Sequence, residues 1–189
     1  MNATDTREKI MSAARKTVQA HGYSALSFRD LAAEVGIKSA SVHYHFPTKG
    51  DLGAAIARRY TDDGIAYLSE LMAGYKDQRS CLKKYTDIFR AALIDDNRMC
   101  LCGIMSAEHE DLPPEVSAEV DRFNAVNIDW ITTLLSLEQA DPKQKKALRH
   151  RALGIFAAIG GAQLLARGQN DVAVYDEVLD SYRVAGLIP

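Results

Sequence analysis

The sequence contains no long hydrophobic run and no motif of a common enzyme site, and both absences narrow the classes of protein to consider. No apolar stretch approaches the roughly 18 residues that a membrane-spanning helix needs. No GxSxG, HExxH, P-loop or dinucleotide-binding motif occurs in its required context. The 189 residues, 47% hydrophobic and 25% charged, have an ordinary globular composition and suffice for one or two domains with a sizeable core. We therefore expect neither a membrane protein nor an enzyme.

Cysteine is scarce, and its three copies do not form a disulfide framework. Cys81, Cys100 and Cys102 are an odd number, and the polar segment 1–7 lacks the apolar core of a secretory signal. We expect free thiols in a cytoplasmic protein. The acidic residues around His109 are more typical of an exposed helix end than of a metal site, so we expect no metal and no cofactor.

The small net charge of -2 hides an asymmetry along the chain. Residues 1–59 carry nine Lys and Arg against five Asp and Glu, a difference of +4, whereas the remainder carries fourteen against twenty, a difference of -6. A basic amino-terminal segment favours contact with nucleic acid, although an excess of this size also arises by chance.

The hydrophobic spacing is helical almost throughout and predicts an all-α fold of about nine helices. Glycines at 22, 36 and 168 are expected to end helices, and Ser27, Thr48 and Asp141-Pro142 to begin them. The expected helices cover about 5–20, 28–35, 39–45, 49–73, 77–95, 99–110, 114–138, 142–167 and 171–185.

The first three helices have the proportions of a helix-turn-helix module. If Val42 and Phe46 of the third helix face the core, a 100° step per residue places Ala40, His43 and Tyr44 on the opposite face. Ser39, Ser41 and His45 then flank that face. A solvated helix normally carries Lys, Glu or Gln there, whereas Tyr and His offer flat, polar-tipped groups for base edges.

Donors suited to phosphate surround this third helix. They are Ser27 and Arg29 at the start of the second helix, Lys38 in the turn, and Thr48 and Lys49 at the start of the fourth. For Ser27 and Thr48 the alternative is that each hydroxyl is only a helix cap.

The segment FRDLAAEVGIKSASVHYHFPTKGDL, residues 28–52, resembles the DNA-binding signature of the tetracycline repressor (TetR) family, and the resemblance is specific over residues 5–55. It implies a homodimeric repressor with a helix-turn-helix domain at 1–48 and a ligand-binding and dimerisation domain at 49–189, linked by the helix at about 49–73. Repression rather than activation is an expectation from the family alone. The resemblance places these residues at or beside operator contacts: Ser27, Arg29, Lys38, Ser39, Ala40, Ser41, His43, Tyr44, His45 and Lys49. The family often has glycine in place of Ala40 and tyrosine in place of His43, a departure that bears on base preference.

The helix around residue 160 is apolar around nearly its whole circumference, so both of its sides must be covered. Glycines inside a helix each cost about 1 kcal/mol relative to alanine, a cost offset if another helix packs closely there. A partner subunit is the expected cover, and the alternative is burial within one chain. The expected dimer surface is Phe156, Gly160, Gly161, Leu164, Tyr175, Val178, Leu179 and Tyr182.

A small-molecule effector is expected in the ligand-binding and dimerisation domain. There it would change the spacing between the two DNA-recognition helices of a dimer, which must lie roughly 34 to 36 Å apart to bind duplex DNA. The expected pocket residues are Tyr67, Phe89, Met99, Cys100, Cys102, Met105, Phe123 and Trp130, for each of which ordinary core packing is the alternative. Residues two apart on a helix point nearly opposite ways, so Cys100 and Cys102 are poor joint ligands or disulfide partners.

The sequence thus predicts a ligand-responsive DNA-binding regulator released from a palindromic operator by a small molecule. A regulator that senses oxidants or electrophiles through Cys100 or Cys102 is an alternative. A helical adaptor that does not bind DNA is another, and weak dependence of duplex binding on salt would distinguish it.

Overall fold

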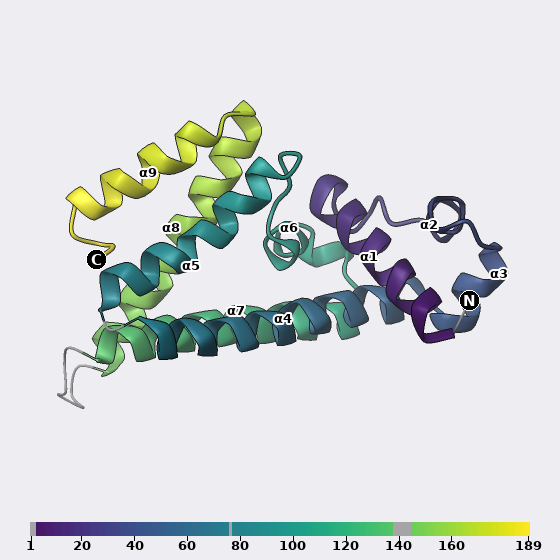
Figure 1. The fold of residues 1–189 in the computed structure, drawn as a ribbon, viewed down its shortest axis with the longest axis horizontal. Helices are drawn as coiled ribbons and strands as arrows, with labels where there is room; N and C mark the ends of the chain where they lie inside the picture. The colour runs from purple at the N-terminus through teal and green to yellow at the C-terminus, as the bar shows by residue number, and fades with distance from the viewer. Residues whose placement is uncertain (1–2, 76, 138–144) are drawn as a thin grey trace. The chain divides into compact units, whose positions relative to one another are not determined.

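A computed structural model describes residues 3–75, 77–137 and 145–189, and within these ranges every regular element is helical. Figure 1 shows the order of the helices along the chain. The helices are α1 (Ala3–His21), α2 (Phe28–Val35), α3 (Ser39–His45), α4 (Lys49–Gly74), α5 (Gln78–Ile94), α6 (Leu101–Ala107), the short 3-10 helix η1 (His109–Asp111), α7 (Pro114–Ser136), α8 (Lys145–Gln169) and α9 (Val172–Val184). No described helix is both long enough and apolar enough to cross a membrane.

The local signals at the amino-terminal helices act as the sequence predicts. Gly22 and Gly36 follow α1 and α2 in the left-handed conformation, at φ 88° and 74°. The Ser27 hydroxyl accepts the amide hydrogen of Asp30 at the start of α2. Thr48 and Asp51 form a reciprocal capping box at the start of α4, in which each side chain accepts the other's amide hydrogen at 3.0 Å.

Several predicted helix boundaries need correction or fall outside the described residues. The helix expected at 99–110 is shorter, because Cys100 is extended (ψ 130°) and a 3-10 turn replaces the end of the helix. Gly168 does not end α8, which continues to Gln169 before Asn170 adopts the left-handed conformation at φ 52°. The helix predicted to reach 138 ends at Ser136, and Leu137 lies in a turn. The predicted cap at Asp141-Pro142 and the helix start there lie outside the described residues.

The chain divides into two compact units. The division does not fall at residue 48, which is the predicted domain boundary. The first unit comprises Met1–Asp62 and Cys100–Phe123, and the second comprises Asp63–Met99 and Asn124–Pro189. Two long helices, α4 and α7, each contribute to both units. The helix-turn-helix segment therefore shares its unit with α6, η1 and the first half of α7.

In the first unit, the buried faces of α1 to α4 form the core on which the candidate site rests. Ile10, Val18, Leu31, Val42 and Leu52 are almost completely buried. Two ion pairs join α4 to α7 within this unit, from Arg58 to Glu119 at 2.7 Å and from Arg122 to Asp62 at 2.6 Å.

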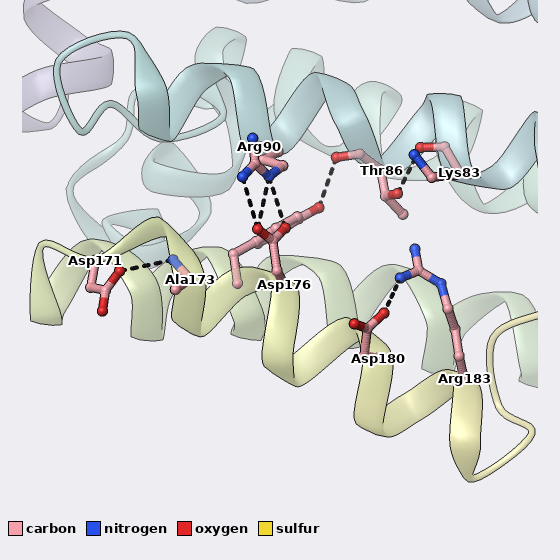
Figure 2. Close-up of polar contacts among 9 residues, drawn as sticks. Lys83, Thr86, Arg90, Asp171, Ala173, Asp176, Asp180 and Arg183 are labelled. Carbon is pink, nitrogen blue, oxygen red and sulfur yellow. Dashed lines mark hydrogen bonds and ion pairs between the residues drawn. The ribbon is translucent and has the colours of Figure 1, made fainter.

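In the second unit, α8 and α9 lie side by side as a hairpin, and α5 packs against both (Figure 1). Figure 2 shows the polar contacts between α5 and α9, where Arg90 forms a bidentate ion pair with Asp176. The buried amide of Gln163 in α8 donates to the carbonyl oxygen of Phe89 in α5 at 2.9 Å. Side-chain hydrogen bonds thus fix α5 to both members of the hairpin.

Candidate nucleic-acid interface

Helix α3 has one buried and one exposed face, as its spacing predicts. Val42 is completely buried, and Phe46, which follows the helix, is 2% exposed. On the opposite face Ala40, His43 and Tyr44 are exposed, and Tyr44 is 81% exposed. The helix therefore presents a small methyl group and two polar-tipped rings to the solvent, a combination suited to the major groove.

Ring contacts orient the exposed aromatic groups of α3. His43 meets the ring of Phe28 in α2 edge to face, with centroids 4.8 Å apart. Tyr44 meets His45 in a similar arrangement at 5.2 Å. Because each ring has a neighbour, the directions of their polar atoms are restricted before any ligand arrives.

The candidate phosphate donors lie at or near the starts of α2, α3 and α4. The Ser27 and Thr48 hydroxyls act as helix caps, as described above. Arg29 and Lys38 are exposed, Ser39 is exposed at the start of α3, and Ser41 is partly exposed. Capping leaves the hydroxyls at the helix starts, where amide hydrogens also point outward and favour anions.

Lys49 differs from the other basic candidates because its ammonium group already has partners. Its Nζ donates to the carbonyl oxygen of Ser24 at 3.1 Å and lies 4.6 Å from the centroid of the Tyr23 ring. Desolvation lowers the pKa of Lys49, and the nearby Glu108 carboxylate opposes that shift. The group is thus held against the turn between α1 and α2.

Comparison with known proteins identifies the family. Residues 10–56 match the family described as bacterial regulatory proteins, tetR family. A TetR transcriptional regulator from Legionella pneumophila is 30% identical, with full coverage of both chains and a TM-score of 0.89. The chain belongs to the TetR family.

Two further relatives are similar over most of their lengths. A TetR-family regulator from Agrobacterium tumefaciens is 27% identical, with 94% of this chain and 95% of that chain covered and a TM-score of 0.84. The nicotine-responsive transcriptional repressor HdnoR of Paenarthrobacter nicotinovorans is 24% identical over 171 residues, which cover 87% of this chain and 84% of the relative. The family consists of DNA-binding transcriptional regulators, and the all-helical fold agrees with it.

The predicted effector residues of this TetR-family chain are divided between the two units. Tyr67, Phe89, Met99 and Trp130 belong to the second unit, whereas Cys100, Cys102, Met105 and Phe123 belong to the first. In the second unit Tyr85, which the sequence analysis missed, lies against both Phe89 and Trp130, with centroids 5.2 and 4.9 Å away.

Buried polar groups accompany this aromatic cluster of Tyr85, Phe89 and Trp130. The Tyr85 hydroxyl donates to Oδ1 of Asn127 at 2.8 Å, and the Trp130 indole nitrogen donates to the carbonyl oxygen of Leu68 at 3.0 Å. Neither Tyr85 nor Asn127 has a sequence signal beyond helical spacing, since spacing identifies a buried face but not the partner across it.

The two cysteines of the thiol-sensing alternative are poorly placed for reactivity. Cys100 is 3% exposed and Cys102 is completely buried. Burial raises the pKa of both thiols, that of Cys102 well above its usual range. A thiol that is both buried and protonated reacts slowly with oxidants and alkylating agents.

The predicted dimer surface needs one correction. Tyr175 and Leu179 are already buried within their own chain, because the inner face of α9 packs on α5 and α8. Gly160, Gly161 and Leu164 are exposed, and the remaining members, Phe156, Val178 and Tyr182, are partly exposed. Together with exposed Leu153, Ala157 and Leu165, the exposed group forms an apolar stripe along α8, defined as Leu153, Ala157, Gly160, Gly161, Leu164 and Leu165.

Proposed function

We propose that this TetR-family chain is a homodimeric repressor that reads a palindromic operator with α3 and releases it when a small-molecule effector binds the helical body. The observation that carries the proposal is the exposed ring of Tyr44, held between the buried anchors Val42 and Phe46. Because the Tyr44 ring is exposed to solvent, it is free to be buried against DNA, and that burial would be favourable. Exposed Arg29 in α2 and exposed Lys38 at the start of α3 supply the positive charge that phosphates require.

The first test uses the duplex that the wild-type protein selects from a random library. Tyr44→Ala should weaken binding to that duplex by about 1 to 3 kcal/mol if the ring reads a base. Ile94→Ala is a matched control, because Ile94 is also well exposed, at 63%, but lies at the end of α5. Affinity should also fall steeply with salt, since the contacts to phosphate displace counterions. Equal affinity of the two variants would contradict the docking through α3.

For the dimer we propose that the apolar stripe of α8 meets its copy in a second chain. The adjacent glycines permit two helices to approach closely, and burial of the exposed leucines stabilises the contact because it removes apolar area from water. Leu164→Glu should convert the protein to a monomer in light-scattering measurements. Leu137→Glu is the control, because Leu137 is 62% exposed against 60% for Leu164 but lies outside the stripe. A dimeric Leu164→Glu variant would contradict this surface.

For the effector we propose a site that includes the aromatic cluster of the second unit, with Tyr67 of the same unit as a further candidate. The flat rings and neutral amide there are suited to an uncharged or aromatic molecule. Trp130 is the chain's one tryptophan, so its fluorescence reports binding. Nicotine, to which the relative HdnoR is named as responsive, is a first probe within a panel of small aromatic molecules. Compounds that change the fluorescence should also release the selected duplex.

A further inference from the structure

We infer that Glu108 is a positioning residue for operator binding, an inference that rests on the function proposed above. Glu108 lies between α6 and η1, far along the chain from the DNA-reading helices. Its carboxylate nevertheless binds the turn that connects α1 to α2, here called the entry turn and defined as residues 22–26. The entry turn determines where α2 begins, and α2 packs directly on α3.

The carboxylate of Glu108 accepts two backbone hydrogens of the entry turn. Its Oε2 accepts the amide hydrogen of Tyr23 at 2.5 Å, and its Oε1 accepts that of Ser24 at 3.3 Å. Consecutive amides that point at one anion form a nest, and a hydrogen bond to a charged acceptor is stronger than one between neutral groups. The arrangement stabilises one conformation of the turn.

Gly22 makes this approach possible. Its φ of 88° is in the left-handed region, and a Cβ built on it would lie 2.7 Å from Oε1 and 2.9 Å from Oε2 of Glu108. Any other side chain at residue 22 would therefore displace the carboxylate as well as strain the backbone. The glycine that ends α1 thus also provides the space for the anion.

Lys49 holds the same turn from α4. It donates to the carbonyl oxygen of Ser24, and its charge interacts with that of Glu108. The next step along the chain is also fixed, because the amide of Leu26 donates to the carbonyl oxygen of Tyr23 at 3.0 Å. Ser27, the cap of α2, follows immediately. An acid that precedes α7 and a base that begins α4 therefore position the start of α2.

The test compares Glu108→Ala with Glu110→Ala. Each variant removes one negative charge, and the two positions are only two residues apart. The carboxylate of Glu110, however, is fully exposed and lies 3.8 Å from the His109 ring nitrogen. For the duplex selected by the wild type, Glu108→Ala should bind about tenfold more weakly, which corresponds to roughly 1.4 kcal/mol. Glu110→Ala should stay within about twofold of the wild type. Glu108→Gln, which keeps one acceptor oxygen, should fall between them.

Amide hydrogen exchange in the DNA-free protein separates positioning from a general loss of stability. In Glu108→Ala the amides of Tyr23 and Ser24 should exchange about tenfold faster, whereas those of α5 and α8 should be unchanged. If the wild type binds DNA and Glu108→Ala matches Glu110→Ala in affinity, the inference is wrong while the proposed function stands. Faster exchange without weaker binding would also overturn it, because Glu108 would then be merely structural. A wild type that selects no duplex overturns the proposed function and this inference with it.

Discussion

The hydroxyl of Tyr175 in α9 donates a hydrogen bond to the carbonyl oxygen of Thr86 in α5 at 2.8 Å. The Tyr175 ring is 1% exposed, and burial raises the pKa of its hydroxyl. The carbonyl oxygen of Thr86 also accepts a backbone amide hydrogen within α5, so the Tyr175 hydroxyl is its second hydrogen-bond donor. The contact joins two helices of one chain, which is why Tyr175 is not available to a partner subunit.

Tyr175→Phe should therefore lower the free energy of unfolding without changing the shape of the ring. A buried hydroxyl hydrogen bond of this kind contributes about 0.5 to 1.5 kcal/mol. Tyr182→Phe is the matched control on the same helix, where the side chain is partly exposed, and the expected change is below about 0.5 kcal/mol. Urea unfolding at one protein concentration measures both. Equal losses in the two variants would contradict a specific role for the Thr86 contact.

Tyr23→Phe, unlike Tyr175→Phe, should not lower the free energy of unfolding at neutral pH. The Tyr23 hydroxyl is buried, and no hydrogen-bond partner for it occurs among the described residues. A buried polar group without a partner costs about 1 to 3 kcal/mol. Removal of this oxygen should leave the free energy of unfolding unchanged or increase it by up to about that amount. A clear loss of stability in urea unfolding at pH 7 would contradict the assignment.

The same residue gives a prediction at alkaline pH. Desolvation, with a smaller contribution from Glu115, raises the pKa of Tyr23 to about 12. Below pH 10 the hydroxyl is protonated in both the folded and the unfolded chain, so it adds no pH dependence. Between pH 10 and 12 only the unfolded chain loses the proton. The free energy of unfolding should then fall by at most about 1.4 kcal/mol per pH unit. Wild type minus Tyr23→Phe, measured across that window, isolates the effect, and parallel curves would contradict it.

The sequence predicted those features of the fold that depend on neighbours along the chain. The caps at Ser27 and Thr48, the left-handed glycines 22 and 36 and the exposed face of α3 all depend on residues within one or two turns of each other. The same local reasoning misplaced the end of α8, because glycine permits a helix stop without requiring it.

The missed features depend on contacts between distant segments. Glu108 looked like one of several acids near His109, and nothing in its neighbourhood indicated two amides some 85 residues away. Tyr175 fitted the spacing of an interface helix, but spacing does not reveal whether the cover is the same chain or a second one. Those partners depend on the tertiary fold.

The buried cysteines lead to a prediction about chemical modification. Cys81 is 1% exposed, and burial raises its pKa as it does those of Cys100 and Cys102. We expect all three thiols to react with a thiol reagent such as DTNB only when the chain unfolds. The modification rate at pH 7.5 should rise together with the loss of helical circular dichroism in urea. One thiol that reacts completely in the native protein would revive the thiol-sensing alternative.

Gly53→Ala and Gly64→Ala, both on α4, should change stability in opposite directions. A Cβ at Gly53 would lie 2.6 Å from Cε2 of Tyr23 and 2.9 Å from Cγ2 of Val116, whereas one at Gly64 has nothing within 4 Å.

Alanine is the better helix former by about 1 kcal/mol, so Gly64→Ala should stabilise the protein by up to that amount. At Gly53 the same gain is outweighed, because an aromatic ring and a β-branched side chain must both move, and overpacking of this kind costs about 1 to 3 kcal/mol. Chemical unfolding measures the two variants side by side. If Gly53→Ala is as stable as Gly64→Ala, the close packing of α4 against Tyr23 and Val116 is wrong, and the position assigned to the entry turn is wrong with it.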